Sequence, residues 1–295
     1  MIPQLHAVED VCPMRGGTQS HLMRCSDGQY YVVKPMNNAQ GRKALFNELF
    51  ASLLARHFGL TVPDFAVVHT HRDLILYTGQ LVVEQQFGRS PWKAGKCFGS
   101  RYVTNKTEVS STLPPATNLL SEYALQFVEN LSEFVGALVF DKWASNCDSR
   151  QAVFYKRPQT GRYWAYFIDS SLCFGGSGWN LRDCPGNGIY FPTRVYDAIT
   201  NLADFEPWIY RLQIAMTRDV LETFSEDIPK EWFPGAEELL QSLIPELEGR
   251  LVRIHEMLRR THAHSPRCFR GWISHNSQSM PGLMSFGHMI TERSA

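Results

Sequence analysis

The sequence predicts an α+β fold with two lobes, a strand-rich lobe followed by a mainly helical lobe. Residues 22–25 and 29–34 contain strand-type side chains and flank Asp27-Gly28, a strong hairpin signal. Leucine and phenylalanine then recur every four residues over 41–57, which is a helical period. From residue 119 onwards most segments have helical character. We therefore expect β structure first and helices afterwards.

Further along the chain, the same signals predict the remaining elements. Gly59 ends the first helix, and Val62-Pro63 leads into a strand. The expected elements are a strand at 65–69, irregular structure around a short strand at 79–99, helices at 119–128 and 131–139, a strand at 163–168, a glycine-rich loop at 175–188, and helices at 205–224 and 236–260, the last starting or kinking at Pro245.

Charge, apolar runs and cysteines narrow the class of protein. Lys+Arg and Asp+Glu both number 29, so the formal net charge is zero and direct nucleic-acid binding is not expected. The longest apolar run, 134–140, is far shorter than the roughly 18 residues that span a bilayer, so no membrane association is expected. The seven cysteines form no C-x-x-C pair, which suits a reducing compartment. The sequence predicts a cytoplasmic protein.

The first candidate site is the turn before the early hairpin. Gly16 and Gly17 would let the backbone approach a phosphate, and Thr18, Gln19 and Ser20 would supply hydrogen-bond donors. A plain tight turn explains the same residues. No G-x-x-x-x-G-K-[ST] motif occurs in the sequence, which argues against a P-loop NTPase.

A lysine and a glutamate form the second candidate pair. Lys34 ends a predicted strand, and Glu48 lies in the following helix. Small residues share the helix face of Glu48, so this face can approach another element closely. A strand lysine and a helix glutamate together position the phosphates of ATP in protein kinases. The competing interpretation is an exposed lysine and a solvated glutamate.

Two aspartates give the strongest signal for a catalytic site. Asp148 lies in a polar loop with Asn146, Arg150 and Gln151, and Asp169 follows the aromatic strand 163–168. Carboxylates that converge on one Mg²⁺ and one hydroxyl are what phosphoryl transfer requires. Alternatively, Asp148 caps a turn and Asp169 caps a helix.

Several motifs, taken in order, resemble the HipA-like kinases, specifically their compact branch without the extra N-terminal subdomain. The resemblance covers roughly residues 5–260. It rests on Met14-Arg-Gly-Gly-Thr-Gln19, Tyr31-Val-Val-Lys34, Asn47-Glu48-Leu49, Phe98-Gly-Ser-Arg-Tyr102, Asp141-Lys-Trp-Ala-Ser-Asn-Cys-Asp148 and Phe167-Ile-Asp169.

The resemblance implies a two-lobed protein-kinase-like fold that uses ATP and Mg²⁺. It suggests Lys34 for phosphate binding with Glu48 as its partner, Asp148 as catalytic base and Asp169 as metal ligand. The segment holding Gly99, Ser100 and Arg101 would lie at the hinge near adenine. Asn146 is counted with the catalytic residues because it lies beside the base.

One position departs from the family pattern. HipA kinases have a metal-binding asparagine five residues after the catalytic aspartate, and this chain has Val153 there. Gln151 carries the only amide oxygen among the residues from 149 to 153 and is the predicted substitute. The departure also favours the alternative of a nucleotide-binding pseudokinase or interaction module.

The expected organisation is a nucleotide-binding lobe at residues 1–102, a catalytic lobe at 103–272 and a flexible tail at 273–295. The predicted function is transfer of the γ-phosphoryl group of ATP to a Ser/Thr hydroxyl. The resemblance alone suggests a protein substrate and autophosphorylation near residues 18–20. It also leaves open a small-molecule acceptor and an antitoxin-like partner.

Overall fold

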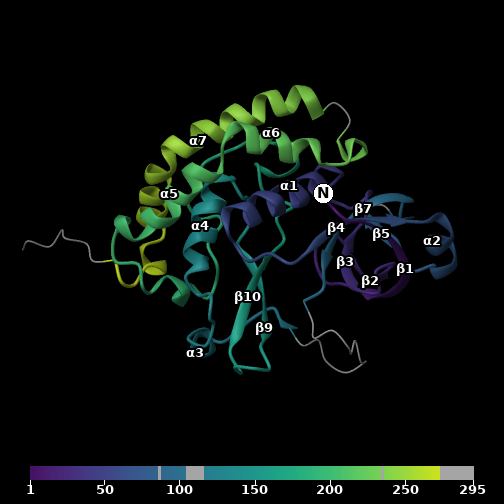
Figure 1. The fold of residues 1–295 in the computed structure, drawn as a ribbon, viewed down its shortest axis with the longest axis horizontal. Helices are drawn as coiled ribbons and strands as arrows, with labels where there is room; N and C mark the ends of the chain where they lie inside the picture. Colours follow the sequence, from purple (N-terminus) through teal and green to yellow (C-terminus); the bar gives the residue numbers. More distant parts are fainter. Residues whose placement is uncertain (86–87, 104–115, 234–235, 273–295) are drawn as a thin grey trace, which may run out of the picture.

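A closed five-stranded barrel forms the N-terminal lobe of the computed structural model, which describes residues 1–85, 88–103, 116–233 and 236–272. Its strands follow the order β1-β2-β3-β7-β4 around the barrel (Figure 1). The parallel pairing of β1 with β4 closes the barrel, and the other pairs are antiparallel. The strands are β1 (Gln4–Pro13), β2 (His21–Cys25), β3 (Tyr30–Lys34), β4 (Phe65–Thr70) and β7 (Gly95–Arg101).

The two-residue period of β3 places Lys34 outside the barrel core. Tyr31 and Val33 are buried in the apolar cluster that fills the barrel. Val32 and Lys34 therefore point to the opposite face, because successive side chains alternate across a strand. That face looks towards the second lobe, and both residues line the cavity described below.

Helix α1 (Lys43–Phe58) joins the two lobes through a large shared core. It is buried on most of its circumference, as expected for a helix that packs between two layers. Gly59 ends the helix with a φ of 96°, a left-handed conformation that glycine adopts without strain. This end was correctly predicted from the sequence.

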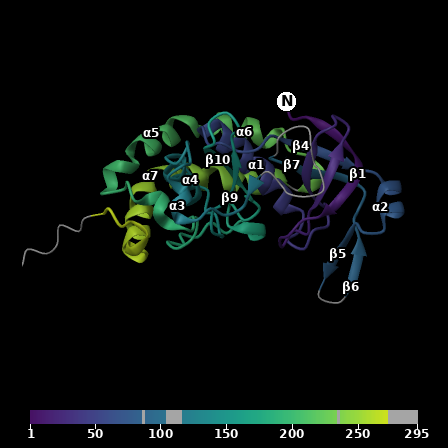
Figure 2. The same ribbon diagram turned by 90° about the horizontal axis from the view of Figure 1, so that it is seen from below.

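A small substructure extends from the side of the barrel. It consists of α2 (Arg72–Thr78) and the hairpin of β5 (Val82–Gln85) with β6 (Gly88–Pro91). Figure 2 shows the hairpin projecting away from the rest of the molecule. The expectation of irregular structure around one short strand at 79–99 was therefore wrong. Two short strands and the start of β7 occupy this stretch.

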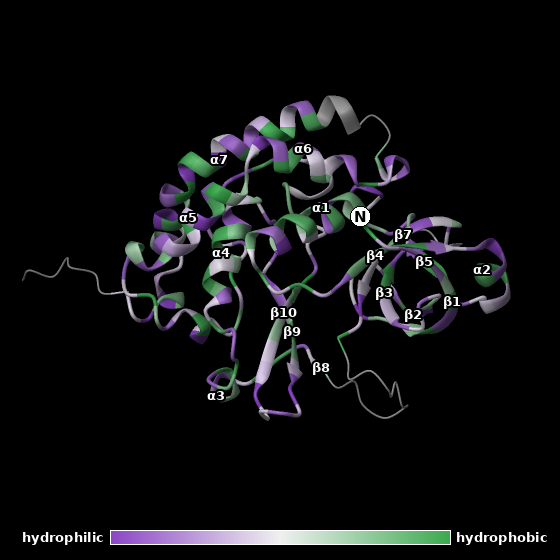
Figure 3. Ribbon diagram, in the orientation of Figure 1, coloured by the Kyte–Doolittle hydropathy of each residue, from purple (hydrophilic) through white to green (hydrophobic). Residues whose placement is uncertain are grey.

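The C-terminal lobe combines a three-stranded sheet with helices. The sheet has the order β10-β9-β8, with β8 (Ala116–Thr117), β9 (Gln151–Lys156) and β10 (Tyr163–Ile168). The α-helices are α3 (Glu122–Leu125), α4 (Glu133–Trp143), α5 (Glu206–Ala215), α6 (Arg218–Glu226) and α7 (Ala236–His264), and short 3₁₀ helices lie at Gly176–Gly178, Thr193–Tyr196, Leu202–Phe205, Lys230–Trp232 and Pro266–Cys268. Apolar residues dominate the central helix α4, whereas α7 alternates between polar and apolar residues (Figure 3).

Two helix predictions needed correction. The helix expected at 119–128 is only one turn, Glu122–Leu125, because the chain then pairs with the sheet at Val128. The helix expected at 205–224 is two helices, and Thr217 caps the second by accepting a hydrogen bond from the Val220 amide. The helix expected at 236–260 is confirmed as α7, and of the two alternatives given for Pro245 the helix does not start there but runs through it.

A connection between α6 and α7 ties the two lobes together. The Trp232 indole donates a 2.7 Å hydrogen bond to the Lys96 carbonyl of β7, and Lys96 Nζ lies 3.1 Å from Glu231. Beside it, Phe233 stacks on Trp179, with Lys43 of α1 above the Phe233 ring.

The predicted lobe boundary at 102/103 falls just after β7. The predicted tail, 273–295, lies outside the described residues. No helix in the described ranges is both long and apolar enough to cross a membrane.

Candidate active site

Lys34 lies between two carboxylates at the junction of the lobes. Its Nζ forms an ion pair with Glu48 of α1 and lies 3.0 Å from Oδ1 of Asp169. Lys34 and Glu48 are both buried, whereas the Asp169 side chain is 32% exposed. The structure thus brings together three predicted site residues from β3, α1 and the end of β10. Of the two carboxylates, that of Asp169 is the more accessible to a ligand.

The antiparallel pairing of β9 with β10 places Asp169 beside Gln151. Ile168 pairs with Gln151, so the end of β10 and the start of β9 meet at one edge of the sheet. Gln151 Nε2 donates a 3.2 Å hydrogen bond to Oδ2 of Asp169. Asp169 has a φ of 59°, a left-handed conformation that costs a non-glycine residue energy and often occurs at functional sites.

The two carboxylates have pKa values that are shifted in opposite directions. Burial, with repulsion from Asp169, outweighs the attraction of Lys34 and raises the pKa of Glu48 to about 7. Burial would also raise the pKa of Asp169, but Lys34 and hydrogen bonds hold it well below its usual range. For Lys34, burial disfavours the charge, yet both carboxylates raise its pKa. One ammonium thus faces two carboxylates, and Asp169 keeps its negative charge most strongly.

A cavity of about 680 Å³ opens between the lobes at this cluster. This volume is within the roughly 300–1,000 Å³ typical of small-molecule sites. The predicted site residues that line it are Gly16, Thr18, Ser20, Lys34, Glu48, Ser100, Arg101, Gln151 and Asp169. Those that do not line it are Gly17, Gln19, Gly99, Asn146 and Asp148. Apolar walls from both lobes, including Val32, Phe98, Val153 and Ile168, complete the cavity.

The predicted phosphate-binding turn covers one side of the cavity. The Met14 amide donates to the Ser20 carbonyl at 2.8 Å, and the Gln19 amide donates to the Gly16 carbonyl at 3.2 Å. Gly16 has a φ of 137°, which a residue with a Cβ rarely adopts. Nε2 of Gln19 donates a hydrogen bond to the Glu84 carbonyl in β5, and Oε1 of Gln19 accepts one from the Glu84 amide. Gln19 therefore attaches the turn to the β5–β6 hairpin, with its side chain turned away from the cavity.

The segment predicted to meet adenine is the last part of β7. Gly99 faces the barrel interior, where a Cβ would lie 2.6 Å from Cγ2 of Val68. Because Gly99 has no side chain, the barrel interior can pack closely at this position. Ser100 lines the cavity, and the Arg101 guanidinium is held by Asp64 and by Gln29.

Contacts with the end of α4 hold the loop that carries Asp148. Buried Asp141 accepts hydrogen bonds from Nδ2 of Asn146 at 3.0 Å and from Nε of Arg150 at 2.8 Å. Oδ1 of Asn146 accepts from the Asp148 amide at 3.1 Å. The buried Asn146 therefore shapes the loop, while Asp148 is half-buried and its Oδ1 accepts a hydrogen bond from the Ser149 amide at 2.7 Å.

Sequence reasoning gave Asn47 no role, although it lies next to Glu48. This fully buried side chain donates to the carbonyls of Ser171 (2.9 Å), Cys173 (3.0 Å) and Gly176 (3.3 Å). Its oxygen accepts from the Trp179 indole at 2.9 Å. Asn47 thereby attaches α1 to the segment after Asp169. An uncharged amide in the middle of an apolar helix was the signal that could have revealed it.

A family model described as HipA-like kinase matches residues 12–265 of this chain. The chain belongs to the HipA-like kinase family. This confirms the resemblance that the motifs carried and identifies the chain as a kinase. The cluster of Lys34, Glu48 and Asp169 at the junction of the lobes is the candidate active site of this kinase.

One solved kinase structure shares the fold. The proinflammatory kinase CtkA of Helicobacter pylori matches with a TM-score of 0.50 and 13% identity, covering 90% of this chain and 99% of that chain. A Golgi casein kinase crystallised with Mn/ADP matches with a TM-score of 0.48 and 12% identity, covering 92% of this chain and 74% of the other. A search of curated proteins finds no match. The predicted two-lobed protein-kinase-like fold is confirmed.

Proposed function

We propose that this kinase transfers the γ-phosphoryl group of ATP, with Mg²⁺, to a Ser or Thr hydroxyl of a protein. The observation that carries the proposal is the contact of Lys34 with both Glu48 and Asp169 inside a cavity of nucleotide size. In protein kinases a strand lysine paired with a helix glutamate positions the phosphates, and a separate aspartate binds the metal. The phosphate-binding turn and the end of β7 border the same cavity.

The possible metal ligands at this site, Asp169 and Gln151, suit Mg²⁺ that is bound together with nucleotide. Mg²⁺ is commonly held by one or two carboxylates plus substrate phosphates. Asp169 keeps a low pKa and therefore a charged carboxylate, and Gln151 lies beside it. Among the residues that the structure describes, no group of three or more His, Cys, Asp or Glu could hold a metal ion by itself. Bound there, Mg²⁺ would offset the charge that develops on the phosphates.

The residues of this chain would divide the remaining work. Asp148 would orient the acceptor hydroxyl and take its proton as the oxygen attacks the γ-phosphorus and the bond to the ADP oxygen breaks. Lys34 would hold the phosphates, with Glu48 fixing its ammonium. Asn146 would keep the Asp148 backbone in place. Positioning and electrostatics supply most of the catalysis in this scheme.

Asp148→Ala tests the proposal. A general base contributes about 10²–10⁴-fold, so the variant should lose at least this much phosphoryl transfer and still bind ATP. Turnover above about a tenth of the wild-type rate would remove Asp148 from the base role. Asp227→Ala, at an exposed aspartate outside the cavity, is the control for general effects of removing a carboxylate.

Autophosphorylation is part of the same proposal. Thr18 and Ser20 both line the cavity in which the phosphates would bind, and both are buried. A phosphate there would add about −1.5 to −2 charge and repel nucleotide. Intact-mass analysis after incubation with Mg²⁺ and ATP should show one added phosphate on residues 18–20, absent in Asp148→Ala. An unchanged mass in protein that starts unphosphorylated would contradict this part.

The second candidate function is a pseudokinase that binds nucleotide or a partner without phosphoryl transfer. Val153, which stands where family kinases have a metal-binding asparagine, favours it. In the structure Val153 forms part of the cavity wall. Mg²⁺-dependent ATP binding without any ATP consumption would support the pseudokinase.

A further inference from the structure

A buried lysine just before the proposed catalytic loop has no ion-pair partner in the described part of the chain. Lys142, in the last turn of α4, is 6% exposed. Its Nζ donates to three backbone carbonyls, those of Cys184 (3.2 Å), Pro185 (2.8 Å) and Asn187 (2.5 Å). Burying a charge is costly unless it is well hydrogen-bonded, so these three charge-assisted bonds must offset that cost. The ammonium holds the 184–187 turn in one shape.

This turn is bonded directly to the loop that carries Asp148. The Gly188 amide donates to the Asp148 carbonyl at 2.7 Å, and the Arg150 amide donates to the Ile189 carbonyl at 3.2 Å. Gly188 has a φ of 72°, and a Cβ there would lie 2.6 Å from Cβ of Asp141. The turn is therefore fixed closely against the end of α4, with backbone bonds on both sides of Ser149.

Two neighbouring residues of α4 thus hold the same loop through different contacts. Asp141 contacts the side chains of Asn146 and Arg150, while Lys142 acts through the 184–188 turn on the backbone of Asp148. If the turn loosened, the Asp148 carbonyl would lose its partner. A displacement of about 1 Å at a catalytic group can cost about 100-fold in rate.

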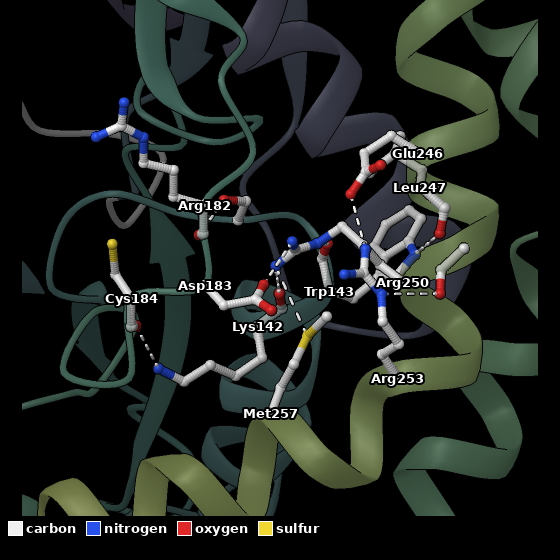
Figure 4. A network of polar contacts seen from close by, with 12 residues as sticks. Lys142, Trp143, Arg182, Asp183, Cys184, Glu246, Leu247, Arg250, Arg253 and Met257 are labelled. Carbon is white, nitrogen blue, oxygen red and sulfur yellow. Dashed lines mark hydrogen bonds and ion pairs between the residues drawn. The ribbon is translucent and has the colours of Figure 1, made fainter.

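Helix α7 in turn fixes the backbone from which Lys142 extends (Figure 4). Arg250 donates to the carbonyls of Lys142 (2.6 Å) and Trp143 (2.7 Å) and to Oδ1 of Asp183 (2.7 Å). The Trp143 indole donates to the Leu247 carbonyl at 2.9 Å. The backbone at Lys142 is therefore fixed, and the position of the 184–187 turn depends on the Lys142 ammonium.

The protonation state of Lys142 decides how many carbonyls it can bind. An ammonium has three donors, whereas a neutral amine has two and directs a lone pair at the third carbonyl. Burial, opposed by the attraction of Asp141, lowers the pKa of Lys142 to about 8. The charged or titratable groups around it are Asp141 on α4, Arg182, Asp183 and Cys184 on the loop, and Arg250 and Arg260 on α7.

We propose that Lys142 is a positioning residue for phosphoryl transfer, which holds Asp148 in place through the 184–188 turn. The proposal rests on the proposed function of Asp148. Because the lysine lies outside the nucleotide cavity, it should affect the rate of transfer and leave nucleotide binding alone. Loss of its proton should weaken the turn and reduce activity at alkaline pH.

The test is the pH dependence of kcat for wild type, Lys142→Met and Lys142→Arg, measured as ADP release. Wild-type kcat should fall as the pH rises through about 8. Lys142→Met should lower kcat about 10- to 100-fold at neutral pH, with KM for ATP changed less than about twofold and no alkaline fall near 8. Lys142→Arg should move the alkaline fall upwards, because a guanidinium stays charged. The exposed Lys230→Met is the matched control and should behave as wild type.

Lys142→Met with at least about half the wild-type kcat and a wild-type pH profile would overturn the proposal. A second measurement separates it from failure of the proposed function or of folding. Hydrogen exchange at one pH should show faster exchange at 146–151 and 184–189 in Lys142→Met, with β3 and α1 unchanged. Wild type without ADP release would refute the proposed function, and this exchange pattern would still show that Lys142 holds the loop. Unchanged exchange in both segments would overturn the role of Lys142.

Discussion

Replacing Glu48 by glutamine should remove a pH dependence from the stability of this kinase. Glutamine keeps the shape of the side chain and mimics the protonated carboxyl. The pKa of Glu48 is raised to about 7 in the folded protein, from an ordinary value of 4.5. Between these values the folded state holds a proton that the unfolded state has lost. The free energy of unfolding therefore falls as the pH rises through this window.

The size of the effect follows from the two pKa values. Linkage gives a loss of about 2.5 kcal/mol in the free energy of unfolding between about pH 5 and about pH 8. Asp169 adds nothing here, because its pKa is lowered and its contribution is lost only at more acid pH. The Glu48→Gln variant should lack this loss. The two proteins should thus be similar in stability near pH 5, and the wild type should be the less stable near pH 8.

Urea unfolding of both proteins at the two pH values measures this difference directly. Comparing wild type with variant at each pH cancels the titration of all other groups that the substitution leaves unchanged. Glu226→Gln, at an exposed glutamate, should change stability equally at both pH values. If the gap between wild type and Glu48→Gln is the same within about 0.5 kcal/mol at both pH values, the raised pKa of Glu48 is refuted.

Three further predictions concern the same site. Asp169→Ala should abolish the Mg²⁺-dependent part of the thermal shift produced by ATP, because the proposed function makes this carboxylate the principal protein ligand of the metal, and calorimetry with and without Mg²⁺ checks this. Gln151→Ala should raise the Mg²⁺ concentration for half-maximal activity and Gln151→Asn should partly restore it, whereas identical magnesium titrations would leave Gln151 a structural role. Asn47→Asp should lose about 2–4 kcal/mol of stability by urea unfolding, because a carboxylate oxygen would face three carbonyls that now accept hydrogen bonds.

Local patterns predicted the elements that lie close to the site. The hairpin of β2 and β3, helix α1 and strand β10 were all found with ends within a few residues of those expected. Their side-chain periods match their structures, and the turn at Asp27-Gly28 and the stop at Gly59 have clear chemical signals. These elements carry Lys34, Glu48 and Asp169, so the core of the site could be read from the sequence.

Long-range pairing was not visible in the sequence. Strand β1 was missed because its pairing register shifts twice, which breaks the alternation of apolar and polar residues that marks a strand. Its parallel pairing with β4 depends on residues about 60 positions away in the chain. The barrel therefore could not be predicted, and neither could the inward direction of Gly99.

Side-chain direction limited the prediction of the site itself. Gln19 was expected at the phosphates, but its amide bonds the backbone of β5, a strand that was not predicted individually. Asn146 was placed with the catalytic residues, and the structure shows its side chain bonded to Asp141 and to the Asp148 amide. Both roles depend on neighbours that come together only in the folded chain.

The bond between the Trp232 indole and the Lys96 carbonyl has a consequence for nucleotide exchange. Because it joins the C-terminal lobe to β7, a swinging motion of one lobe against the other must first remove a fully buried indole from its pocket. Opening and closing of the whole cleft should therefore be rare. Nucleotide would enter and leave by a local movement of the turn at residues 15–20, whose side-chain link to the hairpin at Glu84 is exposed to solvent. In this kinase nucleotide exchange would depend on the movement of this short turn, while the arrangement of the two lobes would stay fixed.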